Sequence, residues 1–333
     1  MLSRSLLALT LLFSVSAFGA QKINGAGASF PAPIYYNWAY AYQKATGVRV
    51  NYQSIGSGGG IKQISSRTVD FGASDKPLEP EELKEKGLYQ FPAVVGSIVM
   101  AINLEEIDHI KLSNDAVSKI AMGKVEYWDD PAIAKENSDL KLPHEMITFV
   151  HRSDGSGTTF NFTYWLSNIS KQWKVLVGTG KAVDWPAGLG AKGNEGVANM
   201  IKQTKGAIGY IEYAYAARNK LTSATLQSKE GTWVEPTEAN FQAAAANAAW
   251  SGDNHFYQVL ALQPGANSYP VVAGTFILIP KDPELKATAA EVWKFFKYAF
   301  DEGDKYAIKL GYIPLPASTK KAIEAYIKAN GII

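Results

Sequence analysis

The sequence contains no cysteine among its 333 residues. This absence excludes disulfide bonds, thiolate metal sites and a lipid-modified cysteine that could tether the chain to a membrane. Histidine is also scarce, with 4 residues in the whole chain, and none has the HExxH spacing of a zinc hydrolase. We therefore expect a protein without a metal or a cofactor.

The sequence also lacks a strong net charge. Its 33 basic residues and 31 acidic residues give a formal charge of +2. A nucleic-acid partner would require a strongly basic face, so none is expected. Any affinity for an anion must come from a local site rather than from the field of the whole protein.

No apolar run in the sequence is long enough to span a bilayer. The run from Leu6 to Val15 follows the single charge of Arg4 and precedes small residues, which is the order of a secretory signal peptide. The small-x-small rule predicts that residues 1–20 are removed, with cleavage after Gly19 or, as the second choice, after Ala20. The mature protein is therefore expected in the periplasm.

The stretch Arg152-Ser153-Asp154-Gly155-Ser156-Gly157-Thr158-Thr159 organises the chain. It follows a predicted strand over 147–150 and precedes a predicted helix over 160–166. The first amides of a helix have no partners within the helix and lie at the positive end of its dipole. Together with serine and threonine hydroxyls and the arginine cation, this turn predicts a site for a small anion.

Two further small-residue turns have the same place between a strand and a helix. Residues 26–33 follow the predicted strand 22–25, and residues 55–60 precede a helix predicted over 61–67. The second of these turns is not a Walker motif, because the first lysine after it is Lys62. Asp75 ends another predicted strand. Ligands of parallel sheets bind beyond the carboxyl ends of the strands, so these positions favour one shared site.

The alternation of strand, turn and helix predicts an α/β fold with mainly parallel sheets. The roughly 310 residues after the signal peptide exceed one typical core, so two domains are expected. We place the boundaries so that residues 21–103 and 270–333 form domain I and residues 104–269 form domain II. The segment 207–215 is predicted to be a strand of domain II. An anion held by turns from both domains would close a hinge between them.

At these residues the sequence resembles the periplasmic phosphate-binding proteins of high-affinity bacterial phosphate ABC transporters. The resemblance implies a two-domain, Venus-flytrap fold of type II, with a central mixed, mainly parallel sheet in each domain. It also implies one dehydrated phosphate in the cleft, and delivery of that phosphate to the permease and ATPase subunits of a transporter by a monomer. The segments that carry it are GAGASFPAP (25–33), GSGGGIKQI (56–64), VDFGASDKPL (69–78), RSDGSGTTF (152–160), GLGAKGNEGVA (188–198) and GAIGYIEYAYA (206–216).

The resemblance also implies the residues that contact the phosphate. Hydroxyl and main-chain donors come from the three turns, Arg152 contributes a charge, and Asp154 supports Arg152. Gly58 stands where relatives often have serine, so it can offer only its amide. The implied contact residues are Ser29, Phe30, Ser57, Asp75, Arg152, Ser156, Gly157 and Thr158.

Asp75 is the single acceptor in this set, and it suggests how the site selects its ligand. A carboxylate that faces an anion repels it in a dry cleft. Phosphate still carries a proton at neutral pH and can donate it to Asp75, whereas sulfate cannot. Asp75 therefore favours phosphate over ligands without a proton.

Other functions remain open at this point. The chain could bind another oxyanion, such as sulfate, molybdate or a phosphonate, or it could be an exported adhesin or signalling protein with the same fold. A hydrolase using Ser156 and His151 is disfavoured, because His151 and Arg152 should point to opposite faces of a strand. The Gly-x-Ser-x-Gly elbow is also absent, so no catalytic residue is expected.

Overall fold

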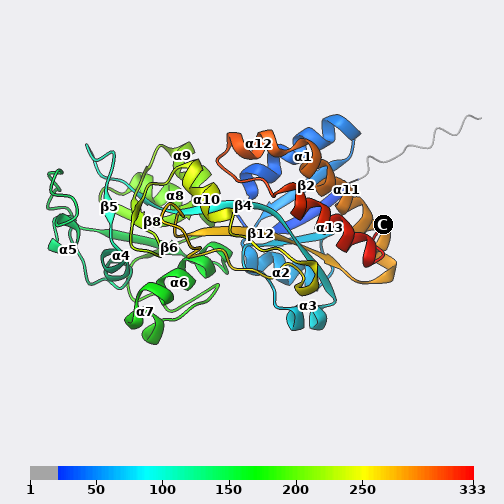
Figure 1. Cartoon of the computed structure of the whole chain (residues 1–333), viewed down its shortest axis with the longest axis horizontal. Coiled ribbons are helices and arrows are strands. Elements are labelled where there is room, and N and C mark those ends of the chain that lie inside the picture. Colours follow the sequence, from blue (N-terminus) through cyan, green and yellow to red (C-terminus); the bar gives the residue numbers. More distant parts are fainter. Residues whose placement is uncertain (1–21) are drawn as a thin grey trace, which may run out of the picture.

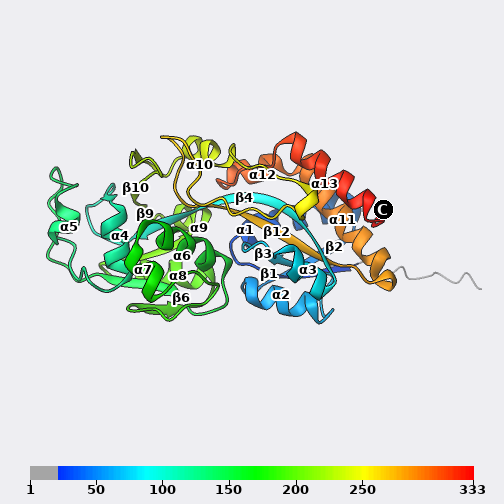
Figure 2. The same cartoon turned by 60° about the horizontal axis from the view of Figure 1, so that its bottom comes forward.

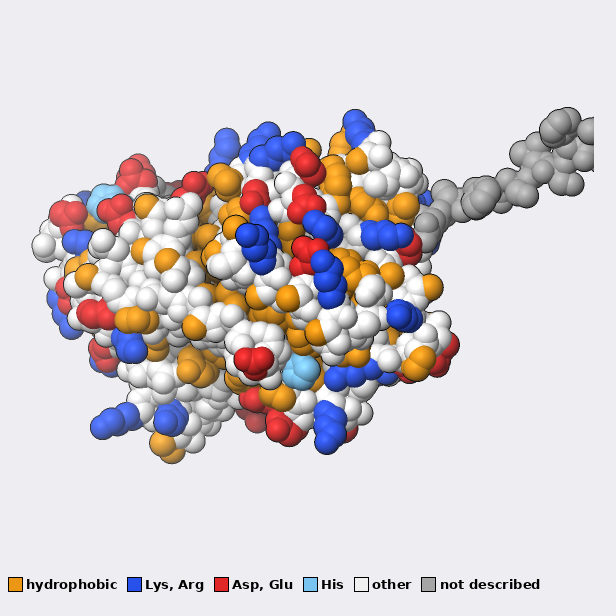
Figure 3. Space-filling model, turned by 45° about the vertical axis from the view of Figure 1, so that its right-hand side comes forward, with side chains coloured by type: hydrophobic (Ala, Val, Ile, Leu, Met, Phe, Trp, Pro, Cys, Tyr) orange, Lys and Arg blue, Asp and Glu red, His pale blue; other side chains and the backbone are white. Residues whose placement is uncertain are grey.

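The computed structural model of the protein describes residues 22–333. The predicted signal peptide and its cleavage site lie outside the described residues. Within 22–333, no helix combines the length and the apolar character needed to cross a bilayer. Basic and acidic side chains are interspersed on the face drawn in Figure 3, in keeping with the small net charge.

One group of elements comes from the two ends of the described chain and packs on the right in Figure 1. Its elements are β1 (Lys22–Gly27), α1 (Ala32–Thr46), β2 (Arg49–Ser54), α2 (Ser57–Ser65), β3 (Phe71–Ser74), α3 (Pro80–Lys86), β4 (Leu88–Ile102), β12 (Val272–Pro280), η2 (Pro283–Leu285), α11 (Lys286–Glu302), α12 (Asp304–Lys309) and α13 (Ala317–Ala329).

The central part of the chain forms the other group, on the left in Figure 1. Its elements are β5 (Lys111–Leu112), α4 (Asn114–Ala121), α5 (Pro131–Ala134), β6 (Thr148–Arg152), α6 (Gly157–Ile169), α7 (Lys171–Leu176), β7 (Leu189–Ala191), α8 (Gly193–Gln203), β8 (Ala207–Glu212), α9 (Tyr213–Asn219), β9 (Thr222–Ser223), β10 (Thr225–Gln227), β11 (Trp233–Val234) and α10 (Glu238–Ala245). The short helix η1 (Gly252–Asn254) follows in the chain but packs against α13 of the first group.

A single mixed sheet runs through both groups in the order β2-β1-β3-β12-β4-β8-β6-β7. The pairs of β1 with β2 and β3, and of β6 with β7 and β8, are parallel. Strand β4 is antiparallel to β12 over Leu88–Ser97 and antiparallel to β8 over Ile98–Ile102. The predicted mixed α/β architecture is confirmed, and β4 is the strand that joins its two groups (Figures 1 and 2).

The continuous apolar sequence of β4 follows from its central place in the sheet. From Gln90 to Ile102 every residue of this strand is buried. Buried strands that are covered on both faces read as apolar runs rather than as alternating patterns. Gly96 lies where a side chain would collide with the Phe30 ring, so its small size lets the first turn pack against β4.

The strand prediction for residues 213–215 was wrong. The strand predicted over 207–215 ends at Glu212, and α9 begins at Tyr213. The reason is local: Oε2 of Glu212 accepts a hydrogen bond from the Ala214 amide at 2.9 Å, which caps the new helix. The aromatic alternation after Glu212 resembled a strand, but a side-chain cap ended it.

Candidate functional site

The structure brings all the residues of the predicted site into one region, where the carboxyl ends of β1, β3 and β6 meet. The predicted contact residues are buried, and Arg152, at 4 %, is the most exposed of the polar ones. We call this region the junction. Its residues are Ser29, Phe30, Ser57, Asp75, Arg152, Asp154, Ser156, Gly157 and Thr158.

Two helices begin inside the turns of the junction. The predicted starts near Ile61 and Phe160 were too late, because α2 begins at Ser57 and α6 at Gly157. The glycines were read as turn residues, since glycine is a poor helix former. In the structure Gly60 is needed within the helix, because a side chain there would collide with the backbone of β1. Both helices therefore direct the amides of their first turns toward the junction.

The two groups of elements touch each other directly at the junction. The Gly157 amide donates to the Ser57 hydroxyl at 3.0 Å, and the Gly58 amide donates to the Gly155 carbonyl at 2.8 Å. The Asn161 side-chain amide donates to the Asp75 carbonyl at 2.8 Å. In this arrangement the amides of Gly157 and Gly58 therefore each donate to an acceptor in the opposite group.

Three hydroxyl groups of the junction, those of Ser29, Ser156 and Thr158, keep their hydrogens available. Ser29 Oγ accepts from both the backbone and the side-chain amide of Asn194, each at 2.9 Å. Thr158 Oγ1 accepts from Arg152 at 3.3 Å and from Asn194 at 3.1 Å. Ser156 Oγ caps α6 by accepting from the Thr159 amide at 3.0 Å. Since each oxygen already serves as an acceptor, its own hydrogen can be donated to an anion.

Arg152 is held by Asp154 in a two-pronged ion pair. Its Nε lies 2.7 Å from Oδ1, and a terminal nitrogen lies 2.6 Å from Oδ2. Burial would raise the pKa of Asp154, but the hydrogen bonds and charge of Arg152 outweigh it and lower that pKa. Asp154 also accepts from the Gly193 amide at 3.0 Å. The guanidinium is therefore fixed in orientation, with one nitrogen directed at Thr158.

Asp75 is the acidic residue of the junction. Its side chain is buried, and Oδ1 has no hydrogen-bond partner within residues 22–333. Its Oδ2 lies 3.5 Å from the Ser57 hydroxyl. Burial raises the pKa of Asp75 to about 7, although Thr275, Arg152 and Ser57 act in the opposite direction. The carboxyl group can therefore change its protonation state near neutral pH.

Asn194 contacts residues of the junction, and sequence reasoning missed it. It lies in the first turn of α8, and its side chain contacts Ser29 and Thr158 while its Oδ1 accepts from the Glu212 amide at 2.9 Å. It thereby connects the first and third turns. The only signal for it was its place in the segment 188–198.

The structure does not pair Ser156 with a histidine. The ring of His151 stacks on Trp185 with a centroid distance of 4.7 Å, and its Nδ1 lies 3.0 Å from the Arg152 carbonyl oxygen. The Arg152 side chain is buried in the junction, so the two neighbours point to opposite faces as predicted. Residues 22–333 also contain no group of three or more His, Asp or Glu side chains that could hold a metal ion.

Comparisons with known proteins identify the family of this chain. The family model of the PBP superfamily domain matches residues 14–302. A phosphate-binding protein PstS from Pasteurella multocida is 49% identical over 326 residues, covering 97% of this chain and 95% of that protein. The protein of the same name from Haemophilus influenzae is 48% identical over 313 residues, covering 93% and 94%.

Among solved structures, a phosphate-binding protein from Stenotrophomonas maltophilia is similar with a TM-score of 0.70. It is 19% identical in sequence, and the match covers 92% of this chain and 93% of that one, so the likeness concerns the fold. The predicted periplasmic-binding-protein fold is confirmed. The chain belongs to the PBP superfamily and, within it, to the family of PstS phosphate-binding proteins.

Proposed function

We propose that this protein binds inorganic phosphate between its two groups of elements and delivers it to a membrane ABC transporter for import. The proposal places the ion at the junction, in contact with Ser29, Phe30, Ser57, Asp75, Arg152, Ser156, Gly157 and Thr158. The names of its family members support this function. The donor-rich chemistry of the junction supports the choice of an oxyanion.

The observation that carries the choice of phosphate is the buried carboxyl group of Asp75 among these donors. Its raised pKa, about 7, lies near neutral pH, where phosphate also keeps at least one proton. One hydrogen can therefore be shared between Asp75 and the ligand. This hydrogen separates the negative charges of the carboxylate and the phosphate. Sulfate, molybdate or a doubly ionised phosphonate would bring no such hydrogen.

The division of the chain is part of the proposal. Residues 21–103 with 270–333 form one domain, and 104–269 form the other, so that β4 and β12 lie at their connection. The hydrogen bonds from Gly157 to Ser57 and from Asn194 to Ser29 then join the two domains. Separation of the domains would break these bonds and admit the ion, and reclosure around it would replace them by bonds to the ligand.

The cellular setting follows from the same proposal. The protein would be exported by its signal peptide, act in the periplasm as a monomer, and pass phosphate to the permease and ATPase subunits of a transporter. Binding requires no catalytic residue, and the family members are named as binding proteins rather than enzymes.

Isothermal titration calorimetry with phosphate, arsenate and sulfate tests the proposal. Phosphate should bind tightly and arsenate detectably, because both have the same shape and keep a proton, whereas sulfate should not compete. Tighter binding of sulfate than of phosphate would select the other-oxyanion function. Turnover of a chromogenic phosphate ester that is lost in Ser156→Ala would select a hydrolase.

Gly56→Ala is expected to weaken phosphate binding about tenfold or more. Gly56 has φ 84° and ψ 153°, and an added methyl group would collide with Asp154 across the junction. The closed arrangement would therefore be disfavoured. The measurement is calorimetric affinity for phosphate.

Gly47→Ala is the matched control for this substitution. Gly47 also has a positive φ, 78°, but no atom lies within 4 Å of the position of an added methyl group. It should lose stability through backbone strain and keep its phosphate affinity. Equal losses of affinity in both variants would mean that strain, and not contact across the junction, weakens binding.

A further inference from the structure

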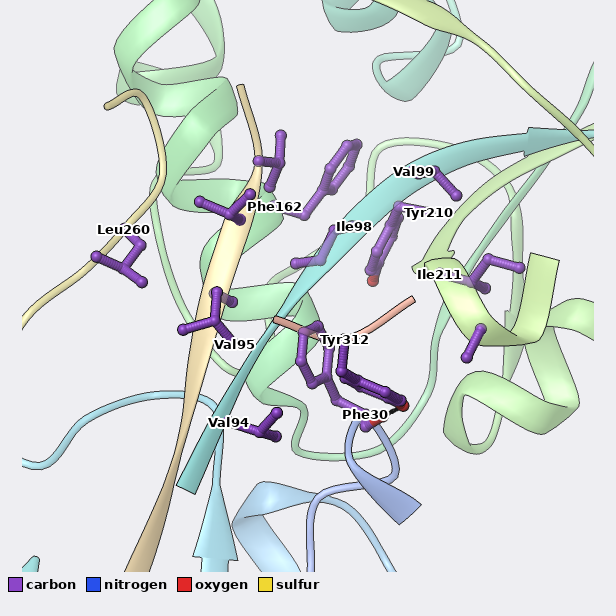
Figure 4. Close-up of a cluster of buried hydrophobic side chains, with 14 of the residues drawn as sticks. Phe30, Val94, Val95, Ile98, Val99, Phe162, Tyr210, Ile211, Leu260 and Tyr312 are labelled. Carbon is purple, nitrogen blue, oxygen red and sulfur yellow. Dashed lines mark hydrogen bonds between the residues drawn. The ribbon is translucent and has the colours of Figure 1, made fainter. Parts of the chain in front are cut away.

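Two tyrosine hydroxyls hold the backbone of the first turn from behind. Tyr215, in α9, donates to the Ser29 carbonyl at 2.6 Å. Tyr312, in the segment before α13, donates to the Phe30 carbonyl at 2.6 Å. The close-up in Figure 4 shows Tyr312 and Phe30 side by side with this bond between them. Both carbonyls belong to the turn that contributes Ser29 and Phe30 to the junction.

These bonds orient the peptide units of the turn. In a planar trans peptide unit the carbonyl and the following amide point in opposite directions. Tyr215, by holding the Ser29 carbonyl, directs the Phe30 amide the other way. Tyr312 fixes the next unit, which leads into α1. The turn is thus held in one conformation by residues that do not themselves belong to the proposed phosphate contacts.

Tyr312 makes a second close contact, and its hydroxyl has only one hydrogen for the two contacts. Its hydroxyl oxygen lies 2.9 Å from Glu212 Oε2, in addition to 2.6 Å from the Phe30 carbonyl. A phenol has one hydrogen, and a backbone carbonyl has none to give. Both contacts become full hydrogen bonds if Glu212 carries a proton and donates it to Tyr312, which then donates its own hydrogen to Phe30.

We propose that Glu212 keeps a proton in the folded protein at neutral pH and acts as a positioning residue, holding the Phe30 turn in its ligand-binding conformation through Tyr312. Glu212 lies at the end of β8, in the central part of the chain, whereas Tyr312 and Phe30 come from its two ends. The chain of bonds therefore spans both groups of elements. The role in ligand binding rests on the proposed phosphate function.

The surroundings of Glu212 favour the neutral acid. The side chain is buried, and Oε1 has no hydrogen-bond partner within residues 22–333. Burial raises the pKa of Glu212 well above its ordinary value, and the negative charge of Asp75 acts in the same direction, whereas the hydrogen bonds with Ala214, Tyr312 and Tyr215 act against it. The titratable side chains that face it are Asp75 beyond β3, Tyr312 before α13, and Tyr213 and Tyr215 in α9.

Carbon-13 NMR of protein labelled at the glutamate side-chain carboxyl groups tests the proton directly, without phosphate. The resonance missing from Glu212→Gln identifies this residue. This resonance should keep the chemical shift of a protonated acid at pH 7. Exposed glutamates, whose pKa values are about 4.3, are ionised at that pH. A resonance that titrates with those exposed groups would overturn the proposal.

Calorimetry of Tyr312→Phe tests the positioning role. Loss of the hydrogen bonds with Phe30 and Glu212 releases the turn, and this should weaken phosphate affinity about tenfold. Tyr269→Phe is the matched control, because it removes another buried hydroxyl. This hydroxyl donates to the Ala224 carbonyl at 3.4 Å and lies outside the junction. The control variant should therefore bind phosphate as the wild type does. Unchanged affinity in folded Tyr312→Phe would overturn the positioning role.

These two measurements separate this inference from the function on which it rests. Wild-type protein that fails to bind phosphate would overturn the proposed function and the ligand role of Glu212 together. The NMR titration would still show whether the buried acid is protonated, since it uses the protein without ligand.

Discussion

Arg152→Met should abolish high-affinity phosphate binding. The guanidinium is buried in the junction, is the cation that would bond the ion directly, and is held by Asp154 at 2.6 Å. Removal of one partner from a buried ion pair leaves the other charge uncompensated, which costs about 3 to 5 kcal/mol. The freed Asp154 would also repel the anion. Calorimetry should therefore show a loss of at least about a hundredfold in affinity.

Arg67→Met is the matched control for this prediction. Arg67 also forms an ion pair, with Asp282 at 2.7 Å, but it is 27% exposed and lies outside the junction. Its replacement should leave phosphate affinity unchanged, because a partly exposed pair contributes little. If Arg152→Met binds phosphate as tightly as Arg67→Met, the Arg152–Asp154 pair is only structural.

Asp75→Asn should relax the choice between phosphate and sulfate by at least about a hundredfold. The ionised carboxylate rejects an anion that has no hydrogen to donate, whereas the amide of asparagine can donate one. Sulfate affinity should rise, and phosphate affinity should change less. Competition calorimetry with both ions measures this ratio, and an unchanged ratio would show that Asp75 does not select the ligand.

The same variant should change the dependence of stability on pH. The pKa of Asp75 is about 7 in the folded protein against an ordinary value of 3.8. A raised folded-state pKa stabilises the protein fully at low pH, and this contribution is lost as pH rises from about 4 to 7. Without phosphate, Asp75→Asn should therefore be more stable than the wild type at about pH 8, by up to about 4 kcal/mol, with the difference shrinking toward pH 4.

Thermal and urea unfolding across this range would measure the difference. If the wild-type protein and Asp75→Asn lose stability in parallel as pH rises, Asp75 is not the group responsible for the pH dependence of stability. Circular dichroism before unfolding checks that the variant has the same secondary structure.

The parts of the site that could be predicted from the sequence were those encoded by local patterns. Serine, threonine, glycine and arginine between a strand and a helix already define donors at a helix start, and the structure has them there. Asp75 was identifiable from its place at the end of a strand. The start of α2 was misplaced, because the need for Gly60 within that helix arises from packing against β1, which no local pattern shows. The start of α6 was misplaced as well.

The supporting residues could not be predicted, because their roles depend on distant partners. Two of the hydrogen-bond partners of Asn194 are 165 and 36 residues away in the chain. Tyr312 contacts Phe30 across 282 residues. Glu212 appeared in the sequence as one residue of a strand, and its cap to α9 and its bond to Tyr312 became visible only with the tertiary structure.

The continuity of β4 limits how the protein can open. This strand forms backbone hydrogen bonds with β12 up to Ser97 and with β8 from Ile98 onward, so the connection that it makes between the two groups is a paired strand rather than a loop. Any opening must bend β4 while its backbone hydrogen bonds stay intact. The strand would then return elastically and bring the turns back to the same relative positions. Each time the protein closes around an ion, the hydrogen-bond donors of the two groups would therefore meet in the same arrangement.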